Sequence, residues 1–462
     1  MFTKETYVSR RDALAARIES GLLVFPGNNE SPMNYADNCY AFRQDSTFLY
    51  YTGCSRPEAA ALLTDDGFEL FLPELGPNDA LWHGPTPSNE VIAARLGAQR
   101  VHGLGALEER VREARPLTLA VADEVRNRTV SAWVDQPLSF GEHHGHEALV
   151  DAVIAMRRVK GPEELEAMTR AARATEHAFR AVMAATRDGS HEQSLTALFH
   201  GVLALHGHTT GYDTILSQSG EVLHNHRHDQ PLEDGRMVLL DGGGEGAEGY
   251  GVDITRTWPV SGRFQPRQRA AYDAVLAAQL AAIDACTVGT GYREVHDVAC
   301  RVLAQWLADE GLLKVGVDEA IERQAHAIFY PHGTGHHLGL DVHDLENFGD
   351  LPSYPKGQGR SELFGASYLR LDLPLEAGWV VTIEPGFYVV PAILRDSALR
   401  ERLHDAVDFD AAEGWLGFGG IRIEDDVHIT SSGPEVLTGV PKAPDAVEAM
   451  VGSGPSAEER LG

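Results

Sequence analysis

The residues from His332 to Asp344 are the strongest candidates for chemistry in this sequence. Within thirteen positions they include four histidines, two aspartates and three glycines, in the order His-Gly-Thr-Gly-His-His-Leu-Gly-Leu-Asp-Val-His-Asp. Imidazoles and carboxylates can bind metals and carry protons. Each glycine costs a helix about 1 kcal/mol relative to alanine, whereas glycine suits a loop or bulged strand whose backbone passes close to a ligand. The stretch alone is equally compatible with a polar loop of surface histidines, so the rest of the chain must decide.

Four other segments each carry an acidic residue in an apolar, strand-like run: Asp241, Asp253, Glu384 and Glu424. One such acid is usually a satisfied turn residue, but several buried carboxylates must be paired or bound to metal. If the fold gathers them, two divalent ions would neutralise their charge. Oxygen ligands with one imidazole suit Mn²⁺, Co²⁺ or Zn²⁺. Two ions can bridge a hydroxide and polarise a carbonyl, and a carboxylate can then shuttle the proton of a hydrolysis.

The elements that would position these acids alternate between helices and strands. The order helix, helix, strands occurs twice between residues 160 and 430, which predicts an α/β domain with an internal two-fold. Ser190 and Gln193 form a capping-box pattern at the start of the second helix. The expected helices are 162–188, the one after Ser190, 265–287 and 292–309, and the expected strands include 237–241 and 251–260.

Residues 1–153 form a separate mixed α/β region with expected strands at 22–25, 60–64, 68–72 and 117–121. Because this region has no set of carboxylates and histidines at metal-ligand spacing, its expected role is scaffold, shielding or assembly. The boundary lies near residues 150–160, which predicts domains at 1–153 and 160–445. A length of 462 residues agrees with two or three domains.

Composition excludes several classes of protein. The formal net charge of −29 argues against a nucleic-acid partner, which requires basic patches. We find no run of about 18 apolar residues, so no membrane span is expected, and the first residues have no apolar segment typical of a signal peptide. The four cysteines include no Cys-x-x-Cys pair, so the expected compartment is the reducing cytoplasm.

A competing motif is Gly244-Glu-Gly-Ala-Glu-Gly249, which matches the dinucleotide-binding pattern GxGxxG. That pattern needs a helix directly after the glycines. The residues that follow are β-branched, aromatic and proline-containing, so a helix is not expected there. Neither a GxSxG nor an HExxH motif is present to anchor other hydrolytic chemistries.

Taken in order, the motifs resemble those of the pita-bread metallopeptidases, and within them the Xaa-Pro branch of aminopeptidase P and prolidase. The resemblance rests on Asp253-Ile-Thr-Arg, the His332 stretch, Glu384-Pro-Gly and Arg422-Ile-Glu-Asp-Asp. The run Phe42–Gly53 is similar to the branch's creatinase-like N-terminal domain. The implied fold is α/β (α+β), with a creatinase-like domain followed by a pita-bread catalytic domain that has an internal pseudo-two-fold.

The resemblance also implies a set of metal ligands. Asp241 would bind one ion alone, Asp253 and Glu424 would bridge both ions, and His336 and Glu384 would complete the other site. Glu384 would also act as the base that shuttles the proton. The family usually prefers two Mn²⁺ ions, with Zn²⁺ or Co²⁺ as alternatives.

Further residues are implied in contact with substrate. His343 would bind the scissile carbonyl or the oxyanion, His224 would support it, and His332 would line the proline pocket. Arg370 is similar to the prolidase arginine that holds the dipeptide's carboxylate, and a structural ion pair is an equally good interpretation of it. Trp82 resembles a residue that closes the active site of a neighbouring subunit.

These roles imply an Xaa-Pro aminopeptidase that takes small peptides with proline in second position. The alternatives are an Xaa-Pro dipeptidase and, more remotely, a lyase or organophosphate hydrolase on the same fold. Members are commonly dimers or tetramers. The chain departs from the family pattern in three places: the interval from Asp241 to Asp253 is one residue longer, and insertions lengthen the loops at 345–368 and 391–417.

Overall fold

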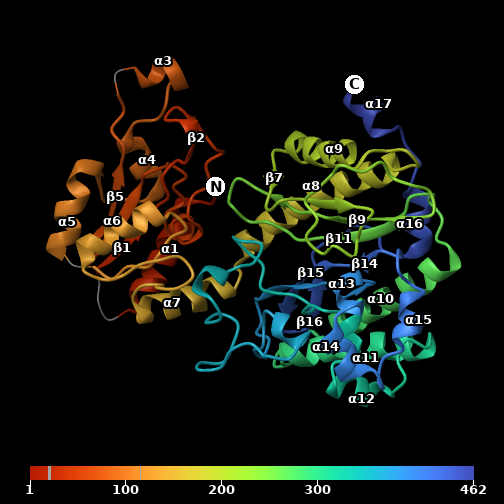
Figure 1. Cartoon of the computed structure of the whole chain (residues 1–462). Coiled ribbons are helices and arrows are strands. Elements are labelled where there is room, and N and C mark those ends of the chain that lie inside the picture. Colours follow the sequence, from red (N-terminus) through yellow and green to blue (C-terminus); the bar gives the residue numbers. More distant parts are fainter. Residues whose placement is uncertain (19–21, 77, 115) are drawn as a thin grey trace. The chain divides into compact units, whose positions relative to one another are not determined.

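The computed structural model describes residues 1–18, 22–76, 78–114 and 116–462. These residues form two compact units (Figure 1). The first comprises residues 1–157 with 345–352, and the second comprises residues 158–344 with 353–462. No described helix combines the length and the apolar character needed to cross a membrane.

The first unit is built on one four-stranded sheet with the order β1-β4-β5-β6. Strands β1 (Leu23–Pro26), β4 (Ala60–Thr64) and β5 (Gly67–Leu72) are antiparallel, and β6 (Arg100–Gly103) adds in parallel. A small hairpin pairs β2 (Pro32–Tyr35) with β3 (Asn38–Cys39). The helices are α1 (Lys4–Ala15), α2 (Ser46–Thr52), α3 (Asp79–His83), α4 (Asn89–Leu96), α5 (Leu107–Ala114), α6 (Glu124–Val134) and α7 (Glu147–Arg158). The strand expected at 117–121 is wrong: Leu117 and Leu119 form only isolated bridges, to Leu23 and Gly145.

The second unit begins with two packed helices, α8 (Pro162–Ala185) and α9 (Glu192–Leu205). Pro162 occupies the first turn of α8, where its missing N–H costs nothing. The N-cap of α9 is His191, whose side chain accepts from Gln193 N, so the Ser190 capping box is wrong. Both helices lie beside the strands β9 and β11 in Figure 1. The antiparallel sheet runs β11 (Thr255–Pro259), β9 (Met237–Asp241), β8 (Ile215–Ser217), and β7 (Thr209–Thr210) pairs with β10 (Gly244–Glu245).

A second helix pair and a second three-stranded sheet follow, as the sequence predicts. Helices α10 (Pro266–Ala285) and α11 (Tyr292–Asp309) pack together. The sheet runs β12 (Val380–Ile383), β15 (Asp425–Thr430), β16 (Gly433–Val436). Short elements complete the unit: α12 (Val317–Glu322), η2 (His326–Ile328), η3 (Glu346–Phe348), η4 (Ala366–Tyr368), α13 (Pro391–Leu394), α14 (Ser397–Leu403), α15 (Phe409–Glu413), α16 (Pro444–Met450) and α17 (Ala457–Leu461).

The two sheets are joined through a short antiparallel pair of strands, β13 (Gly386–Tyr388) and β14 (Gly420–Arg422). Arg422 N donates to Thr257 Oγ1 at 3.1 Å, and Glu424 N donates to Thr255 O at 3.0 Å. These bonds bring the end of β14 against β11. Residues from the two repeats therefore meet at one seam of the unit.

The strand carrying Asp253 is shorter than predicted, because 251–260 is regular only from Thr255 to Pro259. Of the four acids, only Asp241 lies within a strand. Asp253 precedes β11, Glu384 follows β12, and Glu424 lies between β14 and β15. At strand ends the backbone is released from the ladder, so these side chains can turn toward one point.

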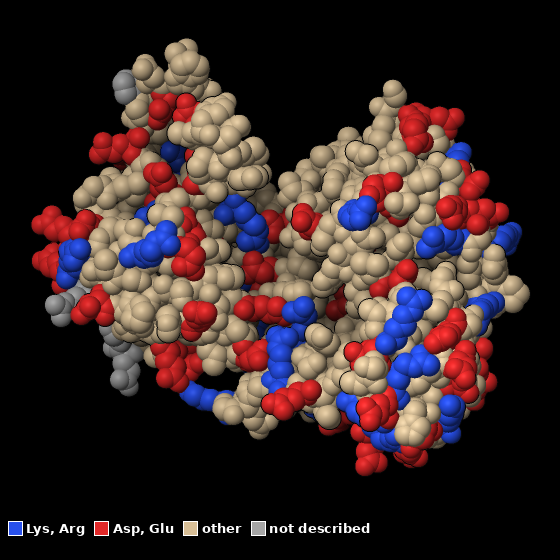
Figure 2. All heavy atoms as spheres, viewed as in Figure 1, with Lys and Arg blue, Asp and Glu red and all other residues tan. Residues whose placement is uncertain are grey.

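Charged side chains of both signs are interspersed over the face drawn in Figure 2. Acidic residues outnumber basic residues in the chain, 68 to 39. The surface of the folded protein thus carries both signs of charge, with an excess of acidic residues as the composition indicates.

Candidate metal centre

Three of the expected ligands form a compact donor set in the second unit. Donor atoms of Asp253, His336 and Glu424 all lie within 4.8 Å of one another, and the three residues are buried. His336 Nε2 is 3.5 Å from Asp253 Oδ2 and 3.7 Å from Glu384 Oε1. The structure therefore brings together side chains that lie 171 residues apart, Asp253 and Glu424, with the histidine and Glu384 between them in sequence.

The glycine-rich stretch reaches this cluster as an extended loop held against β12. Thr382 N donates to His336 O at 3.0 Å, and Glu384 N donates to Thr334 O at 2.8 Å. Gly335 passes so close to Thr382 O and the Tyr292 hydroxyl that a Cβ at this position would collide with both. The glycine is needed here for an approach to protein backbone, and not only for access by a ligand.

His336 is oriented with one nitrogen toward the acids. Its Nδ1 donates to His337 O at 2.9 Å, which leaves Nε2 directed at Asp253 and Glu384. A backbone carbonyl on the second nitrogen is the usual way in which a metal-binding histidine is fixed in one tautomer. The His343 ring lies with its centroid 4.2 Å from that of His336.

Asp241 joins the cluster through two shared partners. The Tyr212 hydroxyl contacts Asp241 Oδ1 at 2.6 Å and also Asp253 Oδ1. Arg422 Nη2 donates to Asp241 Oδ2 at 2.5 Å. Thr255 Oγ1 donates to Glu424 Oε2 at 2.7 Å. Asp241, Asp253 and Glu424 are thus each oriented by a neighbouring side chain.

The long interval between Asp241 and Asp253 is absorbed without loss of register. Asp241 pairs with Thr255 across the β9–β11 ladder, and Gly242 N donates to Ile254 O at 3.0 Å. The chain then turns over residues 246–250. No helix follows Gly249 before α10 among the described residues, so the dinucleotide-binding alternative has no structural support.

The pKa values of the acids bear on which ions the cluster could hold. Burial raises the pKa of Asp241, raises that of Glu384 to about 7, and raises that of Glu424 well above its ordinary value. Burial would also raise the pKa of Asp253, but hydrogen bonds and the charge of His336 outweigh it and lower that pKa. Buried like charges cannot all ionise without a counter-charge. The donor set therefore fits divalent cations, which would allow all four carboxylates to ionise.

Three further predicted residues lie around the cluster. His332 Nδ1 is 3.8 Å from Glu384 Oε2, and its Nε2 is 2.8 Å from the Tyr388 hydroxyl. Burial lowers the pKa of His332 to about 3, so this ring is neutral near pH 7. His224, in the segment after β8, has its pKa lowered by desolvation and by the charges of Arg422 and Arg370. Arg370 is partly exposed and follows η4.

Several supporting residues were not predicted from the sequence: Tyr212, Thr255, Tyr388 and the side chain of Arg422. Thr255 and Arg422 each lie two positions from a predicted acid, so strand alternation could have placed them on the same side. Arg422 Nη1 contacts the Tyr388 hydroxyl at 3.0 Å. No periodicity distinguishes Tyr212, and only the fold brings it to the two aspartates.

Comparison with known families agrees with this site. Residues 166–431 match the model of metallopeptidase family M24, and residues 7–117 match the aminopeptidase P N-terminal domain. The chain is 33% identical to a probable Xaa-Pro aminopeptidase of Verticillium alfalfae, over 94% of this chain and 93% of the relative. It is 31% identical to the Xaa-Pro aminopeptidase of Escherichia coli over 97% and 98% of the two chains. It is also 31% identical to the Xaa-Pro dipeptidase of Homo sapiens over 93% and 88%.

Solved structures of aminopeptidase P have the same fold. The aminopeptidase PepP of Pseudomonas aeruginosa superposes with a TM-score of 0.81 at 29% identity, covering 99% of each chain. The zinc-substituted E. coli aminopeptidase P in complex with product gives a TM-score of 0.79 at 28% identity, covering 97% of this chain and 98% of that one. The chain therefore has an aminopeptidase P-type N-terminal domain, followed in sequence by a domain with the pita-bread fold. The chain belongs to metallopeptidase family M24.

Proposed function

We propose that this chain is an Xaa-Pro aminopeptidase, which removes the N-terminal residue from peptides with proline in second position. The observation that carries the proposal is the buried cluster of Asp253, His336 and Glu424, with Asp241 and Glu384 at its edge. Relatives at 31–33% identity that span nearly the whole chain include proteins named Xaa-Pro aminopeptidase.

We further propose that Asp241, Asp253, His336, Glu384 and Glu424 hold two divalent ions, preferably Mn²⁺. Such ions would supply Lewis acidity and a nucleophile at neutral pH. Glu384 would move the proton from the nucleophile to the leaving amine, a role that suits a carboxyl whose pKa lies near the working pH. His343, whose ring lies beside that of His336, would hold the scissile carbonyl, and His224 would support the developing oxyanion.

Neutral His332 would line the pocket for the proline side chain. The proline ring is apolar, so binding against an uncharged wall would be favourable. Because its pKa is lowered to about 3, it would contribute a hydrogen-bonding ring without a charge. Arg370 would hold a peptide carboxylate if the enzyme were a strict dipeptidase. The similarity to the human Xaa-Pro dipeptidase keeps this second activity as the alternative.

Assembly and compartment are also part of the proposal. Trp82 and Leu81, on α3, are 76% and 75% exposed, and a second copy of the chain in a homodimer or homotetramer would cover them. All four cysteines are free, in agreement with a reducing cytoplasm. The proposed domains are residues 1–153 and 160–445.

The experiment that tests the activity is incubation with Mn²⁺ of two peptides, Ala-Pro and Ala-Pro-Ala, with release of alanine followed by chromatography. Cleavage of the tripeptide is expected and excludes a strict dipeptidase. Cleavage of Ala-Pro alone would support the dipeptidase. If neither peptide is cut while metal is bound, the protein is better explained as a lyase or organophosphate hydrolase on the same fold.

A further inference from the structure

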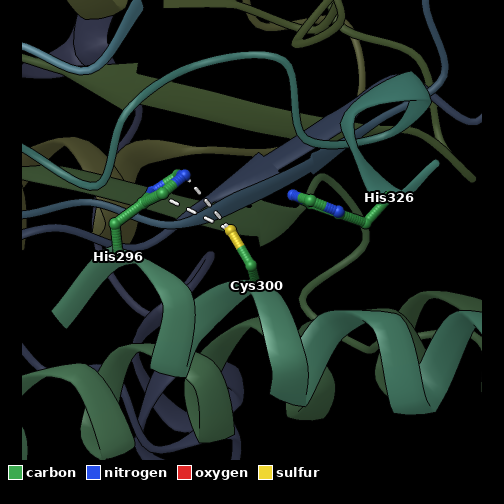
Figure 3. A group of neighbouring side chains, drawn as sticks. All are labelled: His296, Cys300 and His326. Atoms are coloured by element: carbon green, nitrogen blue, oxygen red, sulfur yellow. Dashed lines mark hydrogen bonds between the residues drawn. The ribbon is translucent and has the colours of Figure 1, made fainter. Parts of the chain in front are cut away.

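A second group of potential ligands lies behind the metal centre, on and beside α11. His296, Cys300 and His326 are all buried, and one donor atom from each lies within 4.8 Å of the others (Figure 3). None of these residues belongs to the site described above. By residue type alone, the group could bind a soft metal ion.

The detailed geometry favours a different role. Cys300 Sγ lies 3.3 Å from His296 Nε2 and 3.8 Å from its Nδ1, so the sulfur is beside the ring and not along the lone pair of either nitrogen. His296 Nδ1 is already engaged with Thr334 Oγ1 at 2.9 Å. The group contains no carboxylate to balance a divalent charge in the dry interior. The hydrogen-bonding partner of the His296 ring is instead Thr334.

Thr334 lies between His332 and His336 and is fully buried. Its hydroxyl contacts His296 Nδ1 at 2.9 Å and the Tyr330 hydroxyl at 2.7 Å. Its carbonyl accepts the N–H of Glu384 at 2.8 Å. One residue is thus fixed to α11 by its side chain and to the proposed base by its backbone.

One turn earlier, α11 also contacts β12, the strand against which the loop lies. Tyr292 and His296 are four positions apart and so share a face of α11. The Tyr292 hydroxyl donates to Thr382 O at 2.7 Å, and Thr382 Oγ1 accepts from His336 N at 3.2 Å. The histidine ligand therefore lies between two anchors that start from one rigid helix.

We propose that His296 is a positioning residue for the metal centre, which acts through Thr334 to fix His336 and Glu384. A consistent proton arrangement has Nδ1–H donating to Thr334 Oγ1, with no proton of the Cys300 thiol required for it. Burial lowers the pKa of His296 to about 3, so the ring is neutral and this arrangement persists through the working pH range. The inference rests on the proposed metal-dependent function and deepens it.

The test compares His296→Ala with His296→Asn, since the asparagine amide nitrogen can take the place of Nδ1–H. Removing a residue that supports a metal ligand through hydrogen bonds typically weakens metal affinity by about 10–100-fold. We expect His296→Ala to weaken Mn²⁺ binding to metal-free protein by this amount in isothermal titration calorimetry, and His296→Asn to recover most of it. Thr334→Val should weaken binding as His296→Ala does, and Thr334→Ser should not. For Ala-Pro-Ala, kcat should fall while KM changes little.

Cys300→Ala and His326→Gln are the matched controls, because they alter the same buried group without touching Thr334. They should lower the melting temperature but leave Mn²⁺ affinity within about 3-fold, well below the 10-fold loss expected on disturbing a ligand's support. Unchanged affinity in His296→Ala, or equal losses in Cys300→Ala without rescue by asparagine, would overturn the proposal. So would a third bound metal ion that both variants lose. If His296→Ala fails to fold, the Thr334 pair gives the same comparison.

The outcome also separates this inference from the proposed activity. Wild-type protein that binds Mn²⁺ and shows the variant effects, yet cuts no Xaa-Pro peptide, would refute the activity and support the positioning role. Cleavage of the peptides with no difference among the variants would do the reverse.

Discussion

Glu384 is the residue on which the chemistry depends, because it combines a metal-ligand position with an altered acidity. Its carboxyl lies near both His332 and His336, and burial raises its pKa to about 7. An acid with a pKa near the working pH can both accept and return a proton. The neighbouring acids share the burial but differ in partners: Arg422 contacts Asp241, and Thr255 contacts Glu424.

Replacing Glu384 with glutamine should remove proton transfer while keeping the shape of the side chain. We expect kcat for Ala-Pro-Ala to fall by at least about 100-fold, the lower end of the usual range for a general acid–base group. Steady-state kinetics with saturating Mn²⁺ measures this, with circular dichroism as the control for folding. Retention of more than a tenth of the wild-type rate would assign the proton transfer to another residue.

The same substitution tests the raised pKa of Glu384 in metal-free protein. A folded pKa of about 7 against an ordinary 4.5 means that the folded state holds the proton more tightly. The stability from this group is therefore present below pH about 4.5 and is lost as the pH rises through about 7. Relative to Glu384→Gln, the wild-type free energy of unfolding should fall by on the order of 3 kcal/mol across that window. Urea unfolding at several pH values measures the difference, and a flat difference would contradict it.

At the scale of elements, the site depends on loops that follow or precede strands and are tied to rigid neighbours. One such tie is the ion pair of Lys160 Nζ with Asp344 Oδ2 at 3.0 Å, in which both side chains are 1% exposed. It joins the short link between α7 and α8 to the loop that carries His343. The other is the close passage of Gly335 along β12.

Lys160→Met should destabilise the second unit strongly, because it removes an ammonium group from a buried ion pair with Asp344. Breaking one partner of a buried pair typically costs about 3–5 kcal/mol. Arg301→Met is the matched control, since Arg301 and Asp318 are 51% and 91% exposed and such pairs contribute at most about 1 kcal/mol. The free energy of unfolding is measured with urea. Equal decreases in the two variants would contradict a larger contribution from the buried pair.

Gly335→Ala should separate the loop from β12, because the added Cβ has no room beside Thr382 O and the Tyr292 hydroxyl. His336 would move with the loop, so we expect weaker Mn²⁺ binding together with loss of activity. Gly357→Ala is a suitable control for the effect of a glycine substitution elsewhere, because a Cβ there meets no atom within 4 Å, although its φ of +83° adds backbone strain. Calorimetry that finds Mn²⁺ affinity unchanged in Gly335→Ala would contradict this account of the loop.

The sequence predicted the long helices and the recurrence of helix, helix, strands because amphipathic spacing is local information. Helices α8, α10 and α11 lie close to their expected ranges. It failed at Ser190, where a histidine caps α9, and at 117–121, where apolar residues form only isolated bridges. It could not reveal that Tyr212 reaches two aspartates, since that contact depends on how β9 and β11 pair.

At the scale of the whole molecule, two units are combined in one chain, and the proposed ligands all lie in the second. The first unit supplies the exposed pair Leu81 and Trp82 on α3. The aminopeptidase P N-terminal domain that it matches accompanies an M24 domain here. Its proposed contribution is therefore assembly and not ligation of metal.

Trp82→Ser combined with Leu81→Ser should shift the protein toward a monomer, because it removes the largest exposed apolar side chains of α3. Sedimentation velocity measures the shift, and Leu205→Ser on α9, where the side chain is 82% exposed, is the control. An unchanged sedimentation coefficient in the double variant would place the subunit contact elsewhere.

The most direct test of the whole account is the number of divalent ions bound per chain. Metal-free protein titrated with Mn²⁺ in a calorimeter, with metal content checked by mass spectrometry, should bind two ions per chain. Asp253→Asn, which alters a proposed bridging ligand, should bind at most one tightly. A wild-type protein that binds no divalent ion, or binds two as tightly after Asp253→Asn, would contradict the claim that these side chains form a dinuclear centre.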